Sequence, residues 1–180
     1  NTSSFDYRYA VLSEYEDDDT IILWVDALGI EWLPLLYWGI ANNCDGTITN
    51  VALAQATLPT ETNFNEQWNS MSMPYKKLNK LDKLAHKGVI DEPDYYTCIE
   101  EQMDFVTGIS NQVSSLLAEY RRVVITGDHG TSRLAARFFH CRDGVDVPQD
   151  AIVYSHGRYC KLPQNSTLSL PNVEIVKDAN

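Results

Sequence analysis

The chain alternates between short apolar runs and longer amphipathic segments. Runs rich in β-branched residues, which predict buried strands, occupy residues 20–25, 48–56, 123–126 and 151–154. Segments with apolar residues at every third or fourth position, which predict helices, cover residues 28–40, 75–86 and 97–120. Strands that alternate with helices in this way predict an α/β domain, with a mostly parallel sheet flanked by helices.

Polar side chains stand where three of the predicted strands end. Asp26 follows the first strand, Asp128 and His129 follow the third, and His156 follows the last. The carboxyl ends of parallel strands share one edge of a sheet, where ligands gather. Carboxylates and imidazoles are common ligands of divalent ions. The pattern therefore predicts a metal site at this edge, although Asp26 alone is equally typical of a helix cap.

A second candidate pair lies on a predicted helix. Asp82 and His86 are four residues apart, so on a helix they face the same way. Taken alone, such a pair is more typical of a solvated helix face. Together with the strand-end residues it completes six ligands, enough for two three-ligand sites that keep open positions for a substrate.

A hydroxyl group lies between these ligands in the sequence. Residues 56–62, Ala-Thr-Leu-Pro-Thr-Glu-Thr, break an apolar run at Pro59 and predict a helix start. A hydroxyl at a helix N-terminus can attack phosphorus when a metal lowers its pKa and backbone N–H groups receive the phosphate. Thr60 and Thr62 are both candidates at this stage.

The order of these residues resembles a known family. Asp26, Thr62, the DxxxH of residues 82–86, the Asp128-His129 pair and His156 follow the order found in the alkaline phosphatase superfamily. Within it, the chain resembles the PglZ domain of phage-defence systems (BREX and phage growth limitation). The phrases that carry the closer resemblance are WVDALGIEWLPLL, ATLPTET, KLDKLAHKG, VVITGDHGTSRLAAR and HGRYC, which span residues 20–160.

The resemblance implies an alkaline-phosphatase-like core and a dinuclear site. One ion is then held by Asp26, Asp128 and His129, and the other by Asp82, His86 and His156, with the nucleophile Thr62 between them. Zinc is the usual ion, and manganese or magnesium are alternatives. Phosphodiesterase-like members carry Pro-x-x-Thr, which favours Thr62 over Thr60.

Two assignments stay open beside these. Asp94 lies in a segment that also resembles a metal-ligand segment, but the residue four positions later is Cys98, so Asp82 with His86 is preferred. Arg133 and Arg158 are either surface charges or ligands of substrate phosphates, since arginine suits bidentate contact with phosphate.

Composition narrows the setting. The net charge is −11 over 180 residues. Such a chain is unfavourable for capturing nucleic acid by charge alone. The four cysteines form no CxxC pair and no apolar run spans a membrane, so we expect a cytoplasmic protein with reduced thiols. The residues are consistent with a single domain over 1–180, cut from a longer protein.

The sequence thus predicts a metal-dependent phosphohydrolase or phosphodiesterase. The resemblance implies a role in a phage-defence system, with nuclease activity as one form of the reaction. The substrate is then a phosphate ester or nucleic acid, and other defence proteins are the partners. The alternative is an inactive scaffold module of a defence complex. A phosphoglycerate-mutase-like transferase shares the same site but needs cap regions for which this chain is too short.

Overall fold

The computed structural model describes residues 5–57, 62–87, 95–130, 152–154 and 159–161. The chain divides into two compact units, Asn1–Arg133 and Leu134–Asn180. In the second unit, the described residues form an antiparallel pair of short strands, β4 (Ile152–Tyr154) and β5 (Tyr159–Lys161). The prediction of a single domain over residues 1–180 stays a prediction.

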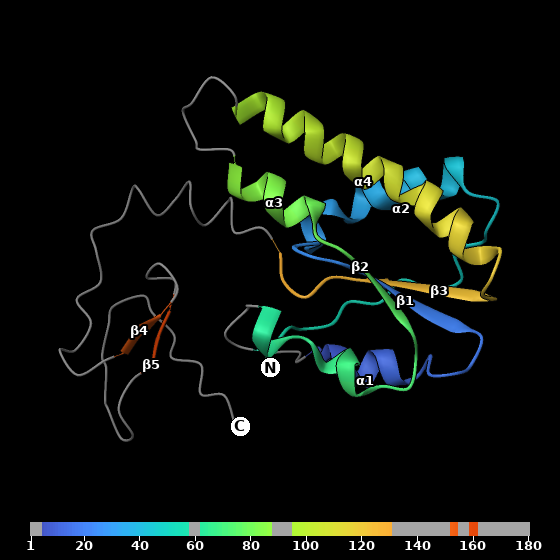
Figure 1. The fold of residues 1–180 in the computed structure, drawn as a ribbon, viewed down its shortest axis with the longest axis horizontal. Coiled ribbons are helices and arrows are strands. Elements are labelled where there is room, and N and C mark those ends of the chain that lie inside the picture. The colour runs from blue at the N-terminus through green and yellow to red at the C-terminus, as the bar shows by residue number, and fades with distance from the viewer. Residues whose placement is uncertain (1–4, 58–61, 88–94, 131–151, 155–158, 162–180) are drawn as a thin grey trace. The chain divides into compact units, whose positions relative to one another are not determined.

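A small parallel sheet organises the first unit (Figure 1). Its central strand is β1 (Thr20–Val25), with β2 (Tyr75–Leu78) on one side and β3 (Arg122–Thr126) on the other. Both neighbours run parallel to β1. An α/β architecture with a parallel sheet is therefore what these residues form.

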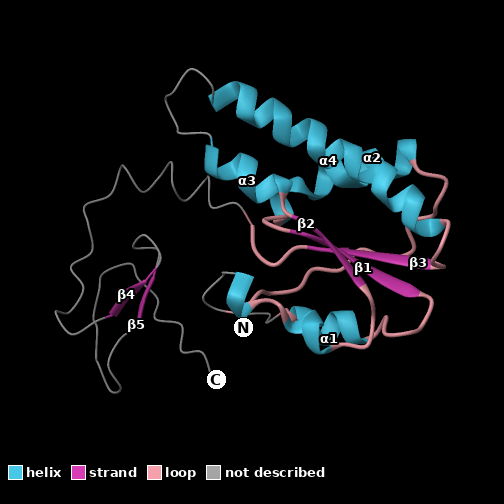
Figure 2. Cartoon of the chain, in the orientation of Figure 1, coloured by secondary structure: helices cyan, strands magenta, loops and turns pink. Residues whose placement is uncertain are grey.

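The two faces of β1 are covered by different elements (Figure 2). All six of its residues are buried. Successive strand residues point to opposite faces. Ile21, Leu23 and Val25 accordingly join a core with three helices, α2 (Leu33–Asn43), α3 (Lys80–Lys87) and α4 (Tyr95–Leu117).

On the other face, Ile22 and Trp24 pack against Trp68 and Met73, and against Leu12 of helix α1 (Arg8–Ser13). Trp68 belongs to a 3-10 helix, η3 (Gln67–Ser70). The Trp24 and Trp68 rings lie 4.5 Å apart between centroids, at an angle of 60°. Tilted aromatic pairs of this kind add to the stabilisation from apolar burial. Because β1 is buried on both faces, it reads as a continuous apolar run rather than an alternating one.

Two predicted helices begin later than expected. The helix predicted over residues 28–40 starts at Leu33, after a 3-10 turn, η1 (Ile30–Trp32), and carries Pro34 in its first turn. Proline is tolerated there because its missing N–H has no helical partner in any case. Residues 75–86 form β2 followed by α3, because pairing with β1 outweighs the helical pattern of the first four residues.

The long helix over residues 97–120 is confirmed as α4, with bounds of Tyr95–Leu117. Helix α4 ends at Leu117, and Arg122 begins β3. The predicted strand at residues 123–126 is confirmed within β3. Among the described residues, no helix combines the length and apolar character needed to cross a membrane.

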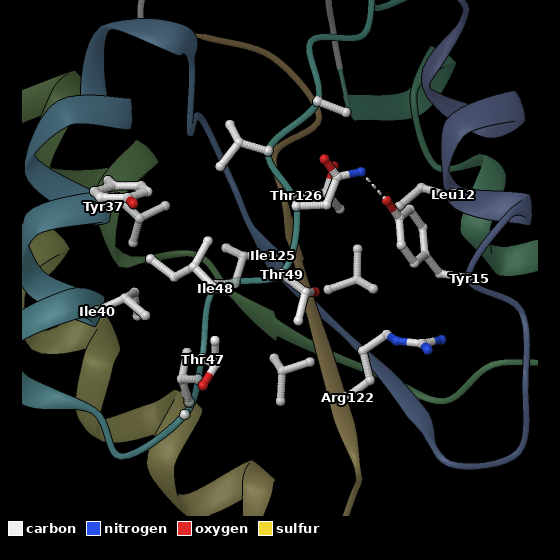
Figure 3. A pocket seen from close by; sticks show the side chains of 18 of the residues that line it. Leu12, Tyr15, Tyr37, Ile40, Thr47, Ile48, Thr49, Arg122, Ile125 and Thr126 are labelled. Carbon is white, nitrogen blue, oxygen red and sulfur yellow. Dashed lines mark hydrogen bonds between the residues drawn. The ribbon is translucent and has the colours of Figure 1, made fainter.

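The strand predicted over residues 48–56 does not form. Within it, only Gln55 makes a bridge, to Tyr7. The segment instead borders a cavity of about 700 Å³ that β3 also lines. Figure 3 shows Ile48 and Thr49 of the segment and Ile125 of β3 at this cavity. The segment therefore lines a cavity without the backbone pairing that defines a strand, and Val51 and Leu53 stay exposed.

The loops that follow β1 and β3 meet backbone to backbone. A Cβ atom on Gly127 would lie 2.2 Å from the carbonyl oxygen of Leu28, and one on Gly29 would lie 2.6 Å from Gly130 Cα. Between Val25 and Leu28, Ala27 takes a positive φ of 65°, a conformation that costs a non-glycine residue energy. Only glycine permits this close approach, which brings the residues after the two strands together.

We predict that Gly127→Ala lowers the free energy of unfolding by about 1–3 kcal/mol, the usual cost of forcing extra atoms into a packed site. Gly108→Ala is the matched control, because a Cβ atom there meets nothing within 4 Å. Gly108 lies inside α4, so its replacement should stabilise by roughly 0.5–1 kcal/mol. Urea denaturation of both variants measures the difference. Equal stability of the two would contradict the close contact.

Candidate metal centre

Three potential metal ligands lie together at the carboxyl edge of the sheet. Asp26 directly follows β1, and Asp128 and His129 follow β3, its hydrogen-bonded neighbour. One ligand atom from each residue lies within 4.8 Å of the other two. The structure thus brings together the three residues that the resemblance assigns to one ion.

The two carboxylate oxygens of Asp26 have different surroundings. Oδ2 forms an ion pair with Lys77 Nζ at 2.9 Å. Oδ1 is buried without a hydrogen-bond partner among the described residues, and it lies 3.5 Å from His129 Nε2. A buried carboxylate oxygen without a donor is costly. A cation bound between Oδ1 and the imidazole would remove that cost, so this donor set fits a divalent ion.

Asp128 is completely buried and bonded through both oxygens. Its Oδ1 accepts hydrogen bonds from the backbone N–H groups of Ala27, at 3.1 Å, and His129, at 2.9 Å. Its Oδ2 accepts one from the Thr62 hydroxyl at 2.7 Å, and lies 3.8 Å from His129 Nε2. The carboxylate is therefore held in one orientation, with Oδ2 turned toward the threonine and the imidazole.

The His129 ring is oriented for ligation. Its Nδ1 lies 3.2 Å from the Gly130 carbonyl oxygen. In the neutral tautomer that donates from Nδ1 to this carbonyl, Nε2 carries a lone pair directed toward the carboxylates. Metal-bound histidines commonly donate their second N–H in this way, which fixes the tautomer and the ring orientation.

The surroundings of Asp26 and Asp128 shift their pKa values in opposite directions. Burial raises the pKa of Asp26, the hydrogen bond from Lys77 opposes this, and the negative charges of Asp128 and Asp82 raise the pKa further, so it is raised overall. Burial also raises the pKa of Asp128, but the Thr62 hydrogen bond, the neighbouring His129 and two backbone N–H groups outweigh it and lower the pKa overall. Asp128 is thus ionised at neutral pH, beside a second carboxylate that a cation would stabilise.

Thr62 is the hydroxyl residue at this cluster. Besides its bond to Asp128, its Oγ1 lies 3.5 Å from His129 Nε2. It begins a 3-10 turn, η2 (Thr62–Phe64), in place of the expected helix. The alternative nucleophile, Thr60, lies outside the described residues, so the choice between the two rests on the contacts of Thr62 and on the sequence.

The second predicted ligand set is only partly described. Asp82 and His86 face each other on α3, with Oδ1 and Nε2 3.3 Å apart. They are not among the clustered ligands of the described residues. The charge of Asp82 does act on the pKa of Asp26. The remaining predicted residues lie outside the described parts of the chain: His156, Arg133, Arg158 and the alternative ligand Asp94.

A buried arginine that the sequence did not single out joins the loops of the site. Arg8, only 7% exposed, donates from Nη1 to the carbonyl oxygens of Gly127, at 2.9 Å, and Asp128, at 2.8 Å. Its Nη2 donates to the backbone oxygen of Asn65, at 2.8 Å, and to the Asn65 side-chain oxygen, at 2.9 Å. The guanidinium therefore links the β3 loop to the turn that carries Thr62.

Asn65 extends this link. It is fully buried, its backbone N–H donates to the Thr62 carbonyl oxygen at 2.8 Å, and its side chain exchanges two hydrogen bonds with the backbone of Thr57. No motif could have found Arg8, because its partners lie 57 to 120 residues away and are mostly backbone carbonyls, which every residue type carries.

The cavity of Figure 3 is a separate feature. Arg8 and Thr126 are among its lining residues, but Asp26, Thr62, Asp128 and His129 are not. Its walls are mainly apolar side chains from α2, β3 and the segment before Gln55. The chemistry-bearing residues thus lie beside it rather than in it.

The fold and the site define an α/β domain with an Asp-Asp-His cluster and an adjacent threonine at the carboxyl edge of a parallel sheet. No family model, curated protein or solved structure matches the chain.

We predict that Arg8→Met lowers the free energy of unfolding by about 3–5 kcal/mol, as is usual when one partner of a buried charged network is removed. Burial lowers the pKa of Arg8 to about 10, with the Asp128 charge opposing, so the side chain is charged at neutral pH. Arg121→Met is the control, because the Arg121 side chain is 69% exposed, and it should change stability by about 0.5 kcal/mol or less. Comparable losses in the two variants would contradict the role of Arg8.

Proposed function

We propose that this chain is a metal-dependent phosphohydrolase or phosphodiesterase domain with an alkaline-phosphatase-like core, in which Thr62 is the nucleophile. The observation that carries this proposal is the position of the Thr62 hydroxyl, 2.7 Å from Asp128 Oδ2 and 3.5 Å from His129 Nε2. The hydroxyl thus lies beside two of the three clustered ligands.

The residues present suit an in-line attack on phosphorus. Asp26, Asp128 and His129 would hold a divalent ion, which supplies Lewis-acid stabilisation and lowers the pKa of a nearby hydroxyl. Asp128 accepts the Thr62 hydrogen bond and so fixes the direction of the hydroxyl. Thr62 would lose its hydroxyl proton to solvent, and its Oγ1 would form a bond to phosphorus while the bond to the leaving oxygen breaks. The leaving oxygen would take up a proton from water and depart as an alcohol. Water would then cleave the phosphothreonine, which releases phosphate or a phosphate monoester and restores the hydroxyl.

A second divalent ion forms part of this proposal. Asp82 and His86, with His156, are its expected ligands by the resemblance to the alkaline phosphatase superfamily. The contact between Asp82 and His86 supports the pairing, because the two side chains face each other at 3.3 Å. Zinc is the expected ion in both positions, and manganese or magnesium are alternatives.

The biological role we propose is that of a PglZ domain in a bacterial or archaeal phage-defence system, with a phosphate ester or nucleic acid as substrate. The net charge of −11 disfavours capture of DNA by this chain alone. Capture would then depend on partner proteins of the same system. The competing function is a scaffold module that keeps the fold without catalysis, and metal content separates the two.

We predict about two zinc or manganese ions per wild-type chain by mass spectrometry, because six ligands support two three-ligand sites. His129→Ala should retain one ion or none, since it removes a ligand from the clustered set. His86→Ala is the informative companion, because it should remove the other ion and leave the first. Absence of bound metal after zinc and manganese are supplied would reject the catalytic function and favour the scaffold.

We predict that Thr62→Ala abolishes turnover of chromogenic phosphate mono- and diesters, by roughly a thousandfold or more, because the covalent route is lost. The metal content of this variant should equal that of the wild type. Thr62→Ser, which keeps a hydroxyl, should retain measurable turnover and incorporate labelled phosphate into the protein. Full activity in Thr62→Ala would show that another group, such as Thr60, is the nucleophile.

A further inference from the structure

Lys77 reaches the metal cluster from the strand next to β1. It lies on β2 opposite Trp24 in the parallel register. Its ammonium group lies 3.7 Å from the centroid of the Trp24 ring and 2.9 Å from Asp26 Oδ2. A cation over an indole face is attracted by the ring and gains more when partly desolvated. The buried Trp24 ring and the carboxylate therefore hold the ammonium in one position from two sides.

Because of this position, the two oxygens of the Asp26 carboxylate have different partners. Oδ2 is occupied by Lys77, whereas Oδ1 is buried without a hydrogen-bond donor among the described residues and lies 3.5 Å from His129 Nε2. A free carboxylate can bind an ion through one oxygen or through both. With Oδ2 held by an ammonium, only Oδ1 is open to an ion shared with His129 and Asp128.

The ammonium also adds a positive charge to the site. Asp26 and Asp128 together cancel the charge of one divalent ion, and His129 is neutral in its ligating form. Lys77 then adds a positive charge to that of Arg8 beside Asp128, which favours binding of a phosphoryl anion. Its side chain is 32% exposed, against 10% for Asp26, so it lies between the buried carboxylate and solvent.

Of the two adjacent lysines on β2, Lys77 contacts the metal cluster and Lys76 does not. Lys76 alternates with Lys77 along β2, and its ammonium donates to the side chain of Gln112 on α4 at 2.8 Å. Lys76 is exposed and has no contact with the cluster among its described bonds. Lys76 and Lys77 carry the same charge but lie on opposite faces of the sheet.

We propose that Lys77 is a positioning residue of the metal centre: held between the Trp24 ring and Asp26 Oδ2, its ammonium restricts Asp26 to one metal-binding oxygen and adds a positive charge that strengthens binding of a phosphoryl anion. This inference rests on the proposed function, since it concerns the same ion and the same substrate group.

The test compares Lys77→Met, Lys77→Arg and the control Lys76→Met with the wild type, each checked for folding by thermal denaturation. The first readout is the visible absorption of the cobalt-substituted protein, whose intensity falls as the coordination number of Co²⁺ rises. Lys77→Met frees Asp26 Oδ2, so its spectrum should weaken. Lys77→Arg and Lys76→Met should keep the wild-type spectrum.

The second readout is the affinity of the ion-loaded protein for inorganic phosphate, measured by calorimetry. Lys77→Met should bind phosphate roughly tenfold more weakly, since it loses an adjacent opposite charge in a partly desolvated site. Lys77→Arg retains the charge and should stay within about threefold of the wild type. Lys76→Met should bind as the wild type does.

Two failures are distinguishable. If the wild type binds ions but Lys77→Met keeps the wild-type spectrum and phosphate affinity, the role of Lys77 is rejected and the proposed function is untouched. The same holds if Lys76→Met weakens phosphate binding as much as Lys77→Met, because the effect would then reflect general surface charge. A wild type that binds no ion under any supply would reject both proposals together.

Discussion

The geometry of the site depends on the hydrogen bonds that the Arg8 guanidinium donates. It donates to carbonyl groups of the loop after β3 and to Asn65, which in turn is bonded to Thr62 and Thr57. These segments are loops and short turns, which by themselves have few ways to satisfy buried backbone groups. A planar donor with five N–H groups satisfies several of them at once. Arg8 of helix α1 therefore links the loop that carries Asp128 to the turn that follows Thr62.

Charge balance is the second constraint. Two carboxylates approach each other at the carboxyl edge of the sheet, and the protein compensates their negative charges to different degrees. Asp128 is stabilised by hydrogen bonds and by His129, while Asp26 has one oxygen on Lys77 and the other without a donor among the described residues. Asp26 Oδ1 and His129 Nε2 are placed so that a cation between them would complete their interactions. Its cost in the folded chain is consistent with the general observation that functional sites carry perturbed carboxylates.

Much of the fold follows from local patterns. The apolar run at β1, the three-to-four periodicity of α4 and the strand before Asp128 are confirmed because each is long or strongly biased. The helix predicted over residues 75–86 was wrong for its first four residues, because they pair with β1. Strand pairing is a tertiary property that the local pattern does not contain. The strand predicted over residues 48–56 was wrong, because only Gln55 pairs with another segment and the apolar Val51 and Leu53 stay exposed. The grouping of Asp26, Asp128 and His129 was predictable, because strand ends in a parallel sheet share an edge.

By itself, the sequence determined the α/β class, the placement of acids and histidines after strands, and the pairing of Asp82 with His86 along one helix. These depend on periodicity and on strand direction, which are readable locally. Only the tertiary structure decided that the Thr62 hydroxyl reaches Asp128, that Arg8 links the two loops, and that Lys77 takes one oxygen of Asp26. Each of these contacts joins residues far apart in the chain, through distances that no spacing rule encodes, so they exist only once the sheet and its loops have packed.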